Sequence, residues 1–182
     1  MHKEILRLRK LVATNKEDSF VDHIIRVRRV TKVTKGGKRF AFSAHVVTGD
    51  RKGNVGMASG SSREASLAIA KATNRARRKM IAVPLRGTTV PYGTTGKHGA
   101  SKVIIRPASK GTGNIAGGAC RAILDAAGVV DVLTKSLGSS NGFNIAKATL
   151  NALARMRSAV HIARLRGKTV RELFGDAHVE AQ

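Results

Sequence analysis

Two β-rich segments joined by a pair of glycines constrain the fold of this chain more than any other feature. Residues 24–33 are rich in β-branched side chains with arginines between them, and in residues 40–46 the apolar Phe40, Phe42, Ala44 and Val46 alternate with Ala41, Ser43 and His45. Between the segments stand Gly36 and Gly37, flanked by Lys35 and Lys38, where a tight turn needs positive φ angles. The pattern predicts an antiparallel hairpin of two strands.

The residues after this hairpin predict a third strand and a helix. A polar turn at residues 48–54 leads into a short strand at 55–58. Ser61 or Ser62 is expected to cap the helix, with Glu64 in its electropositive first turn. Small and apolar residues recur at helical spacing and predict one buried face, made of Ala65, Ala68, Ile69, Ala72, Ala76 and Met80. The first unit is therefore βββα.

A stretch rich in Pro and Gly, residues 84–99, separates this unit from a second one. A strand is expected at 88–90, and the rest of the stretch is expected to be linker and loop. Beyond it the sequence predicts, in order, a strand at 102–106, a glycine-rich loop, a helix at 116–127 ended by Gly128, a strand at 129–137 and a helix after the turn at 138–142. The fold class is α+β, with a βββα unit followed by a ββαβα unit.

The charge balance indicates what the chain binds. It has 34 Lys and Arg against 11 Asp and Glu, a formal net charge of +23, which a polyanion such as nucleic acid would neutralise. Membrane binding is disfavoured because the sequence has no long apolar span and no amphipathic helix with aromatic residues on its apolar face. Aromatic residues make up only 3%, too few to stack many single-stranded bases, so folded RNA gripped by its backbone is the better target.

Enzyme and metal chemistry are not indicated. The six histidines occur singly and Cys120 is the only cysteine, so no metal site, disulfide or cofactor is expected. The few acidic residues form no catalytic constellation. The first residues lack the apolar core of a secretory signal, which favours a cytoplasmic location. We interpret the chain as a non-enzyme.

The glycine-rich loop GTGNIAGG, residues 111–118, matches the dinucleotide-binding fingerprint but lacks its surroundings. Four residues separate Arg106 from Gly111, although the first glycine of that fingerprint follows its strand directly. Asp131 falls near the start of the next predicted strand, at the wrong edge of the sheet for a ribose-binding acid. The glycines are expected instead to let the backbone approach a packed helix or a phosphate backbone.

Two groups of cations are the candidate RNA-binding residues. On the predicted helix, Lys71, Arg75 and Arg78 form a stripe opposite the alanine face. Such a stripe also occurs as a solvated face near a helix C-terminus, but the scarcity of acidic residues favours phosphate contact. The second group crowds the predicted hairpin and consists of Arg26, Arg28, Arg29, Lys32, Lys35, Lys38 and Arg39.

Several long motifs together resemble one known family. They are GGKRFAFSAHVVTGDRKGNVG (36–56), ARRKMI (76–81), RPASKGTGNIAGGACRAILDAAGV (106–129) and LTKSLGSSNGFNIAKATLNAL (133–153). Through them the chain resembles bacterial small-subunit ribosomal protein five from about residue 25 to residue 169. The resemblance implies an N-terminal domain similar to double-stranded-RNA-binding domains and a two-layer C-terminal domain with a left-handed βαβ crossover. We expect a basic extension at 1–22, these domains at 23–84 and 85–172, and a tail at 173–182.

The resemblance also implies a function. A structural ribosomal protein of this family binds 16S rRNA, contacts small-subunit proteins four and eight, shapes the region where mRNA enters and contributes to decoding fidelity. Residues 29–32 match the hairpin segment that the family associates with spectinomycin sensitivity, and residues 35–38 match the loop that approaches rRNA of the head. The expected RNA-binding set therefore also includes Thr31, Gly36 and Gly37, together with Lys110. The expected protein interface consists of Gly111, Thr112, Gly113, Gly117, Gly118 and Arg121.

Two segments depart from the family pattern. Residues 56–61 replace a pattern richer in glycine that ends in a lysine, and residues 141–144 lack a proline after Asn141, so the helix is expected to begin differently. Two other functions stay open at this point. One is a free-standing double-stranded-RNA-binding or RNA-chaperone protein, and the other is an NAD-linked enzyme that would bind its nucleotide at residues 111–118.

Overall fold

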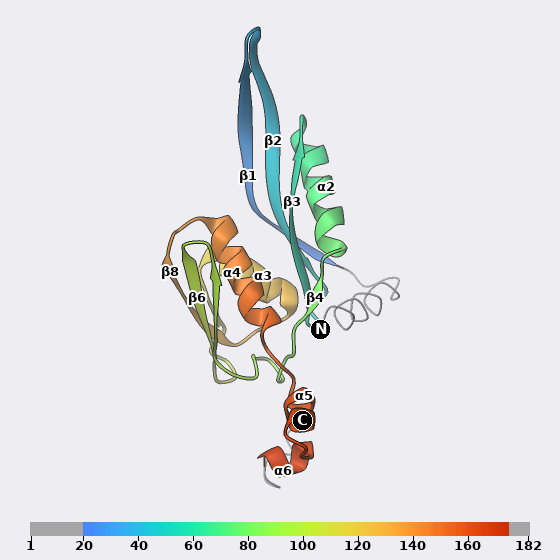
Figure 1. The fold of residues 1–182 in the computed structure, drawn as a ribbon, viewed down its shortest axis with the longest axis vertical. Helices are drawn as coiled ribbons and strands as arrows, with labels where there is room; N and C mark the ends of the chain where they lie inside the picture. The colour runs from blue at the N-terminus through green and yellow to red at the C-terminus, as the bar shows by residue number, and fades with distance from the viewer. Residues whose placement is uncertain (1–19, 175–182) are drawn as a thin grey trace.

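The computed structural model describes residues 20–174, so nearly all of the predicted basic extension and most of the predicted tail lie outside the described residues. The described chain builds two sheets with helices packed against them (Figure 1). In chain order the elements are β1 (Val21–Thr34), β2 (Gly37–Gly49), β3 (Asn54–Ser62), α2 (Ala65–Arg77), β4 (Ile81–Ala82), β5 (Thr94–His98), β6 (Ser101–Pro107), β7 (Asn114–Ile115), α3 (Gly118–Ala127), β8 (Val132–Gly138), α4 (Gly142–Ala154), α5 (Ala159–Leu165) and α6 (Val170–Phe174).

β1 and β2 form the predicted hairpin, and it is longer than the rest of its sheet. The two strands pair from Val21 with Gly49 to Thr34 with Gly37, whereas β3 pairs with β2 only as far as Phe42. Residues 30–41 therefore pair only with each other and rise above β3 as a narrow extension, which we call the hairpin arm (Figure 1). The predicted turn geometry was half wrong, because Gly37 has a φ of 138° but Gly36 has no positive φ.

α2 packs its alanine face on the first sheet, as the helical spacing predicts. Ala68, Ala72 and Ala76 are fully buried. The facing strand supplies glycines, and a Cβ on Gly60 or Gly56 would overlap the carbonyl oxygens of Ala68 and Ala76. Small residues on both sides thus let the helix and the strand approach closely, since no side chain separates their backbones.

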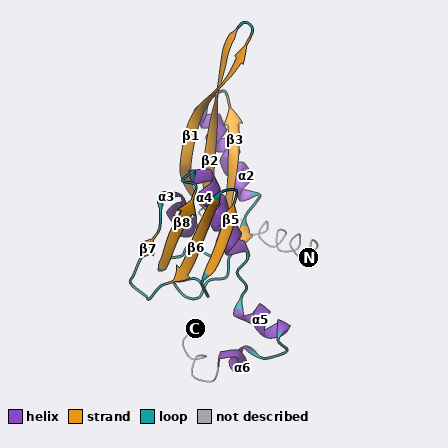
Figure 2. Ribbon diagram, turned by 60° about the vertical axis from the view of Figure 1, so that its left-hand side comes forward, coloured by secondary structure: helices purple, strands orange, loops and turns teal. Residues whose placement is uncertain are grey.

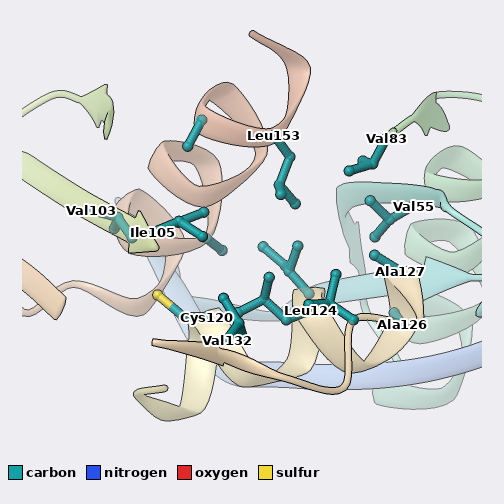
Figure 3. Close-up of a cluster of buried hydrophobic side chains, with 14 of the residues drawn as sticks. Val55, Val83, Val103, Ile105, Cys120, Leu124, Ala126, Ala127, Val132 and Leu153 are labelled. Carbon is teal, nitrogen blue, oxygen red and sulfur yellow. The ribbon is translucent and has the colours of Figure 1, made fainter. Parts of the chain in front are cut away.

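The second sheet has the order β5-β6-β8-β7, with α3 and α4 packed on one face. β5, β6 and β8 are antiparallel, while the short β7 runs parallel to β8, so β7, α3 and β8 form a βαβ unit. Gly128 ends α3 with a φ of 86°, as its place in the sequence predicts. Val103, Ile105 and Val132 point from the sheet into the core (Figure 3).

The two halves share one hydrophobic core. Val55 and Val83 of the first half lie in the same cluster as Leu124 and Leu153 of the second (Figure 3). The halves are also joined through the backbone, where the Arg51 N–H donates to the Ala126 carbonyl at 3.0 Å and the Gly53 N–H donates to Ala127 at 2.9 Å. α3 and α4 are consequently packed between the second sheet and the base of the hairpin.

Several predicted boundaries were wrong for identifiable reasons. Ser61 and Ser62 do not cap α2, because they pair with β2 and lengthen β3, and the helix begins after Glu64 without a side-chain cap. Residues 88–90 form no strand; only a single bridge joins Arg86 and Thr89. The first strand of the second unit is instead β5, in a segment that was expected to be linker.

The chain after α4 forms two short helices that the sequence pattern did not predict. Ser158 and Thr169 begin them, because the Ser158 hydroxyl accepts from the His161 N–H and the Thr169 hydroxyl accepts from the Glu172 N–H. α5 and α6 line, with residues 84–86, 91 and 92, a pocket of about 340 Å³ that is open to solvent. The Tyr92 hydroxyl accepts from the Arg157 N–H at 2.8 Å on one wall of this pocket.

Candidate nucleic-acid interface

The hairpin arm presents both of its faces to solvent. Every residue of the predicted RNA-binding set from Arg26 to Arg39 is exposed, including the turn glycines. No acidic residue occurs between Asp22 and Asp50, so the cations of the arm have no carboxylate neighbour on either strand. Such a surface has an excess of positive charge that only an anionic partner can balance.

One cation of the hairpin is held by an aromatic ring. The Arg29 guanidinium carbon lies 4.5 Å from the centroid of the Phe40 ring, on the neighbouring strand. Phe40 itself is 47% exposed. A cation stacked on a ring keeps its N–H donors at the ring's edge, so Arg29 is ordered without being neutralised.

The base of the hairpin is tied to α2 by an acidic residue. Asp22 accepts a hydrogen bond from the Thr48 hydroxyl at 2.6 Å and forms an ion pair with Arg77 at 3.1 Å. Arg77 also lies 5.2 Å from the centroid of the Phe20 ring. Arg77, which the sequence places beside the cationic stripe of α2, is therefore engaged in the protein's own structure.

The stripe of α2 lies along the open edge of β3. Lys71 donates to the Ser61 carbonyl at 3.4 Å and Arg75 donates to the Ser59 carbonyl at 3.1 Å. Lys71, Arg75 and Arg78 are exposed. The first two side chains cover edge carbonyls that would otherwise be free to pair with another strand. Each retains further donors, because a lysine has three N–H groups and an arginine has five.

His45, which the sequence did not single out, connects the hairpin to the second unit. Its ring lies 4.6 Å from that of Phe143 on α4. Burial lowers the pKa of His45, and the positive charges of Arg28 and Arg26 lower it further. The imidazole is therefore neutral at pH 7 and adds no charge to the cations beside it. The sequence could not reveal this contact, because the spacing of the histidines is informative about metal binding but not about which ring packs on which.

The glycine-rich loop is pinned by Asp131. One carboxylate oxygen accepts from the Gly111 N–H at 3.0 Å and from the Gly113 N–H at 2.9 Å. A hydrogen bond from the Thr88 side chain lowers the pKa of Asp131, and the bonds from Gly113 and Gly111 and the charge of Lys110 lower it further, against the opposing effect of burial. Asp131 lies at the wrong sheet edge for a ribose ligand, and its partners are the Thr88 side chain and the backbone of the loop.

The expected reason for these glycines was partly wrong. A Cβ added to Gly111, Gly113, Gly117 or Gly118 would have no other atom within 4 Å, so these positions do not make room for a packed helix. Gly111 and Gly113 have φ angles of 90° and 78°, a backbone conformation that favours glycine over every other residue. The face of the loop toward which these Cβ atoms would point is open to solvent.

The predicted protein-interface residues form one cluster, separate from the arm. Arg121 on α3 donates to the Asn114 carbonyl at 3.5 Å, and the Thr112 hydroxyl donates to the Ser109 carbonyl at 2.7 Å. Lys110, predicted to bind RNA, belongs to this loop and is exposed. The arm extends from one end of the molecule, whereas β7 lies at the edge of the second sheet, away from the arm (Figure 2).

Metal sites and membrane spans are absent from the described part of the chain. Within residues 20–174, no group of three or more His, Cys, Asp or Glu is placed to hold a metal ion. No helix in that range is long and apolar enough to cross a membrane.

Comparisons with known proteins give one consistent family. Residues 20–84 match the family model described as ribosomal protein S5, N-terminal domain, and residues 96–166 match ribosomal protein S5, C-terminal domain. A relative from Pseudomonas entomophila (strain L48), named small ribosomal subunit protein uS5, is 51% identical over 159 residues, which cover 87% of this chain and 96% of the relative. The protein of the same name from Gluconobacter oxydans (strain 621H) is 52% identical over 159 residues, covering 87% and 83%.

Proposed function

The chain belongs to the S5 family of small-subunit ribosomal proteins, and from this premise we propose that it binds small-subunit rRNA chiefly through the hairpin arm and α2. It is a structural constituent of the small ribosomal subunit, serving translation, and not an enzyme. In bacteria this places it on the ribosome in the cytoplasm. The residues that contact RNA are the subject of the proposal.

The hairpin arm is the observation that carries this proposal. A pair of strands that extends beyond its sheet buries little of its own apolar surface, because no third strand or helix of residues 20–174 covers either face. Its exposed cations surround a turn made of Lys35 and Gly36, which is narrow because it has no side chain at one of its two positions. Such a tip fits the groove of a folded RNA helix and contacts phosphates on both sides.

α2 supports the arm as a second contact. Its exposed cations, Lys71, Arg75 and Arg78, project from the same unit as the arm. Lys71 and Arg75 lie along the open edge of β3. An RNA contacted by these cations would therefore lie against that edge. Together the two surfaces would recognise the shape of an RNA through its backbone and not its base sequence.

The finer roles concern partners other than rRNA. We propose, from the resemblance to the family, that the glycine-rich loop with Arg121 contacts ribosomal protein four of the small subunit; a loop fixed by Asp131 and open on its outer side is compatible with such a contact. Contact with protein eight, a place beside the region where mRNA enters and a contribution to translational accuracy rest on the resemblance to the family alone.

A binding titration tests the arm. The arm variant replaces three exposed cations at the tip, Lys32→Ala, Lys35→Ala and Lys38→Ala, and is titrated against deproteinised, refolded small-subunit rRNA at several salt concentrations. Each phosphate that the variant no longer touches flattens the slope of log K against log salt by about 0.7 to 0.9, so a slope flatter by about 2 to 3 is expected. The matched control removes three exposed cations near the C-terminal helices, Arg155→Ala, Arg164→Ala and Lys168→Ala. Equal slopes for the two variants would remove the arm from the interface.

A further inference from the structure

The two sides of the β1–β2 hairpin differ in their chemistry. Phe42 packs with Ala44 and Ala68 in the core cluster beneath α2, whereas His45 contacts Phe143 of α4 from the opposite side of the sheet. Directly paired residues lie on the same side of a sheet, and residues two apart on a strand share a side. The register of β1 and β2 therefore assigns each residue of the hairpin either to the side of Phe42, which we call the α2 side, or to the side of His45, which we call the α4 side.

The α4 side of the hairpin carries most of its cations. His45 lies on this side, and its partner in the register is Arg26. Steps of two residues along each strand from this pair place four cations here: Arg26, Arg28, Lys32 and Arg39. All four are exposed, and none of them forms an ion pair with another residue of the range 20–174. The α4 side is therefore suited to contact with phosphates.

The α2 side of the hairpin is mainly apolar, although it is exposed to solvent. Val33 is 71% exposed, Phe40 is 47% exposed and Val27 is 38% exposed. The same register places only two of the hairpin's cations on this side, Arg29 and Lys38. Exposed apolar side chains that gather on one side of an element mark an interaction surface.

Arg29 and Phe40 form a stack on the α2 side. Arg29 pairs with Phe42 and Phe40 pairs with Thr31, so Arg29 and Phe40 are diagonal neighbours across the two strands. The guanidinium carbon of Arg29 lies over the Phe40 ring, 4.5 Å from its centroid. A guanidinium is planar and more weakly hydrated than an ammonium, so the pair offers flat, weakly hydrated surface. Nucleobases stack on such surfaces, both on aromatic rings and on arginine planes.

A base fits the α2 side better than a phosphate or a protein does. Phosphates are attracted by cations, and the α2 side has fewer of them than the α4 side. A protein that covered Arg29 would have to supply a carboxylate, because a buried cation without a partner is costly. A base stacked on the pair leaves the N–H donors of Arg29 free to bond to phosphate oxygens of the same RNA.

We propose that Arg29 and Phe40 form a platform on which one unpaired base of folded small-subunit rRNA stacks, while the cations of the α4 side contact phosphates. The inference rests on the proposed rRNA-binding function and deepens it, because it assigns the two sides of the hairpin to different parts of the RNA. Since stacking on a side chain needs a base that is free of its own helix, the RNA has a bulge or loop beside the groove that receives the tip.

Two variants that preserve charge test the platform. Phe40→Leu removes the ring and Arg29→Lys removes the planar guanidinium, and neither changes the net charge. Titrated against the same refolded rRNA, each is expected to lower the affinity by about 5- to 150-fold, the loss of one stacked base, without changing the slope of log K against log salt. Phe40→Tyr retains the ring and should retain the affinity. Val30→Ala, which shortens an exposed apolar residue of the α4 side, is the matched control and should also retain it.

The outcomes separate the platform from the proposed function. If the arm variant flattens the salt slope while Phe40→Leu and Arg29→Lys bind like the unaltered protein, the platform is wrong and the proposed function stands. If Phe40→Leu lowers the affinity and also flattens the slope, the ring only holds a cation that binds phosphate, and the stacked base is wrong. If the arm variant keeps the full slope, the proposed function fails as well.

Ultraviolet crosslinking of assembled small subunits locates the base. Because irradiation links a base to an aromatic ring stacked on it, the peptide that contains Phe40 is expected to carry a nucleotide, detected by mass spectrometry, and to lose it in Phe40→Leu. Crosslinked peptides elsewhere in the protein without a nucleotide on the Phe40 peptide would overturn the inference. Poor retention of Phe40→Leu in assembled subunits, with full affinity for free rRNA, would overturn it too, since a protein would then cover the α2 side.

Discussion

At the scale of single residues, Asp131 shows how one carboxylate fixes a loop that has few side chains of its own. It is 1% exposed, and its hydrogen bonds hold two glycine N–H groups that no other acceptor satisfies within the described residues. The Thr88 carbonyl accepts from the Val130 and Asp131 N–H groups, so the segment before β5 holds the carboxylate in place. The loop's shape therefore depends on an ionised acid.

The stability of the fold should depend on pH through this residue. A folded-state pKa below the unfolded value gives stability that is present above the unfolded value and lost as pH falls through the folded one. Asp131→Asn should therefore lower the free energy of unfolding most near neutral pH, and the difference from the unaltered protein should shrink below about pH 4. Urea unfolding at a series of pH values measures this, and a difference that stays constant with pH would contradict it.

Replacing glycine with alanine should have different effects on stability at two positions. A Cβ on Gly49 would overlap the Ala126 carbonyl, which already accepts from the Arg51 N–H at the junction of the two halves. Gly49→Ala should cost about 1 to 3 kcal/mol of unfolding free energy, the usual cost of overpacking. Gly36→Ala has no atom within 4 Å of the added Cβ and should change stability by less than about 0.5 kcal/mol. Equal effects in urea unfolding would show that the junction is not tightly packed.

At the scale of elements, α2 has two roles that a variant can separate. Lys71→Ala, Arg75→Ala and Arg78→Ala together should weaken rRNA binding and flatten its salt slope by about 0.7 to 0.9 for each phosphate that the helix no longer touches. Because Lys71 and Arg75 also bond to β3, a charge-preserving control is needed: Lys71→Arg, Arg75→Lys and Arg78→Lys. This control should keep most of the salt slope, and an alanine variant with an unchanged slope would remove α2 from the interface.

Elements with a clear period or turn signal were predicted, and elements made by tertiary packing were not. The hairpin is confirmed because alternation and two glycines act locally on residues 24–46. β5 was missed because its sequence, TTGKH, has no apolar alternation, and it is placed by Gly96, where a Cβ would overlap the Ala148 carbonyl of α4. β7 has two residues, too few for any period to be visible.

In the candidate site, too, features set by local sequence were predicted and contacts made by the fold were not. The exposed cations of the hairpin follow from composition and alternation, and their exposure is confirmed, while their contact with RNA stays a prediction. The bond from Asp131 to the loop could not be predicted, because it joins residues 18 and 20 positions apart that only the fold brings together. Lys102, Ile104 and Arg106 alternate with apolar residues in the sequence, which predicts a strand, but the register of that strand with β8 could not be predicted.

At the scale of the whole molecule, the excess positive charge and the single shared core are typical of a protein that works bound to a polyanion within a larger assembly. The chain has 34 Lys and Arg against 11 Asp and Glu, and among the described residues the cations of the hairpin and α2 form one ion pair with an acid, Arg77 with Asp22. Such a chain repels itself when alone and gains most from a large polyanion. The predicted split into domains at residues 84 and 85 remains a proposal, because the core crosses from Val55 and Val83 to Leu124.

The central claim is that this protein works as part of the small subunit and not as a free RNA binder. The most direct measurement is sedimentation of the tagged protein from a bacterial lysate through a sucrose gradient, repeated after a moderate-salt wash of the particles. The account predicts that the protein travels with the small subunit and remains bound after the wash. Recovery of the protein at the top of the gradient would contradict it and favour a free-standing RNA-binding protein.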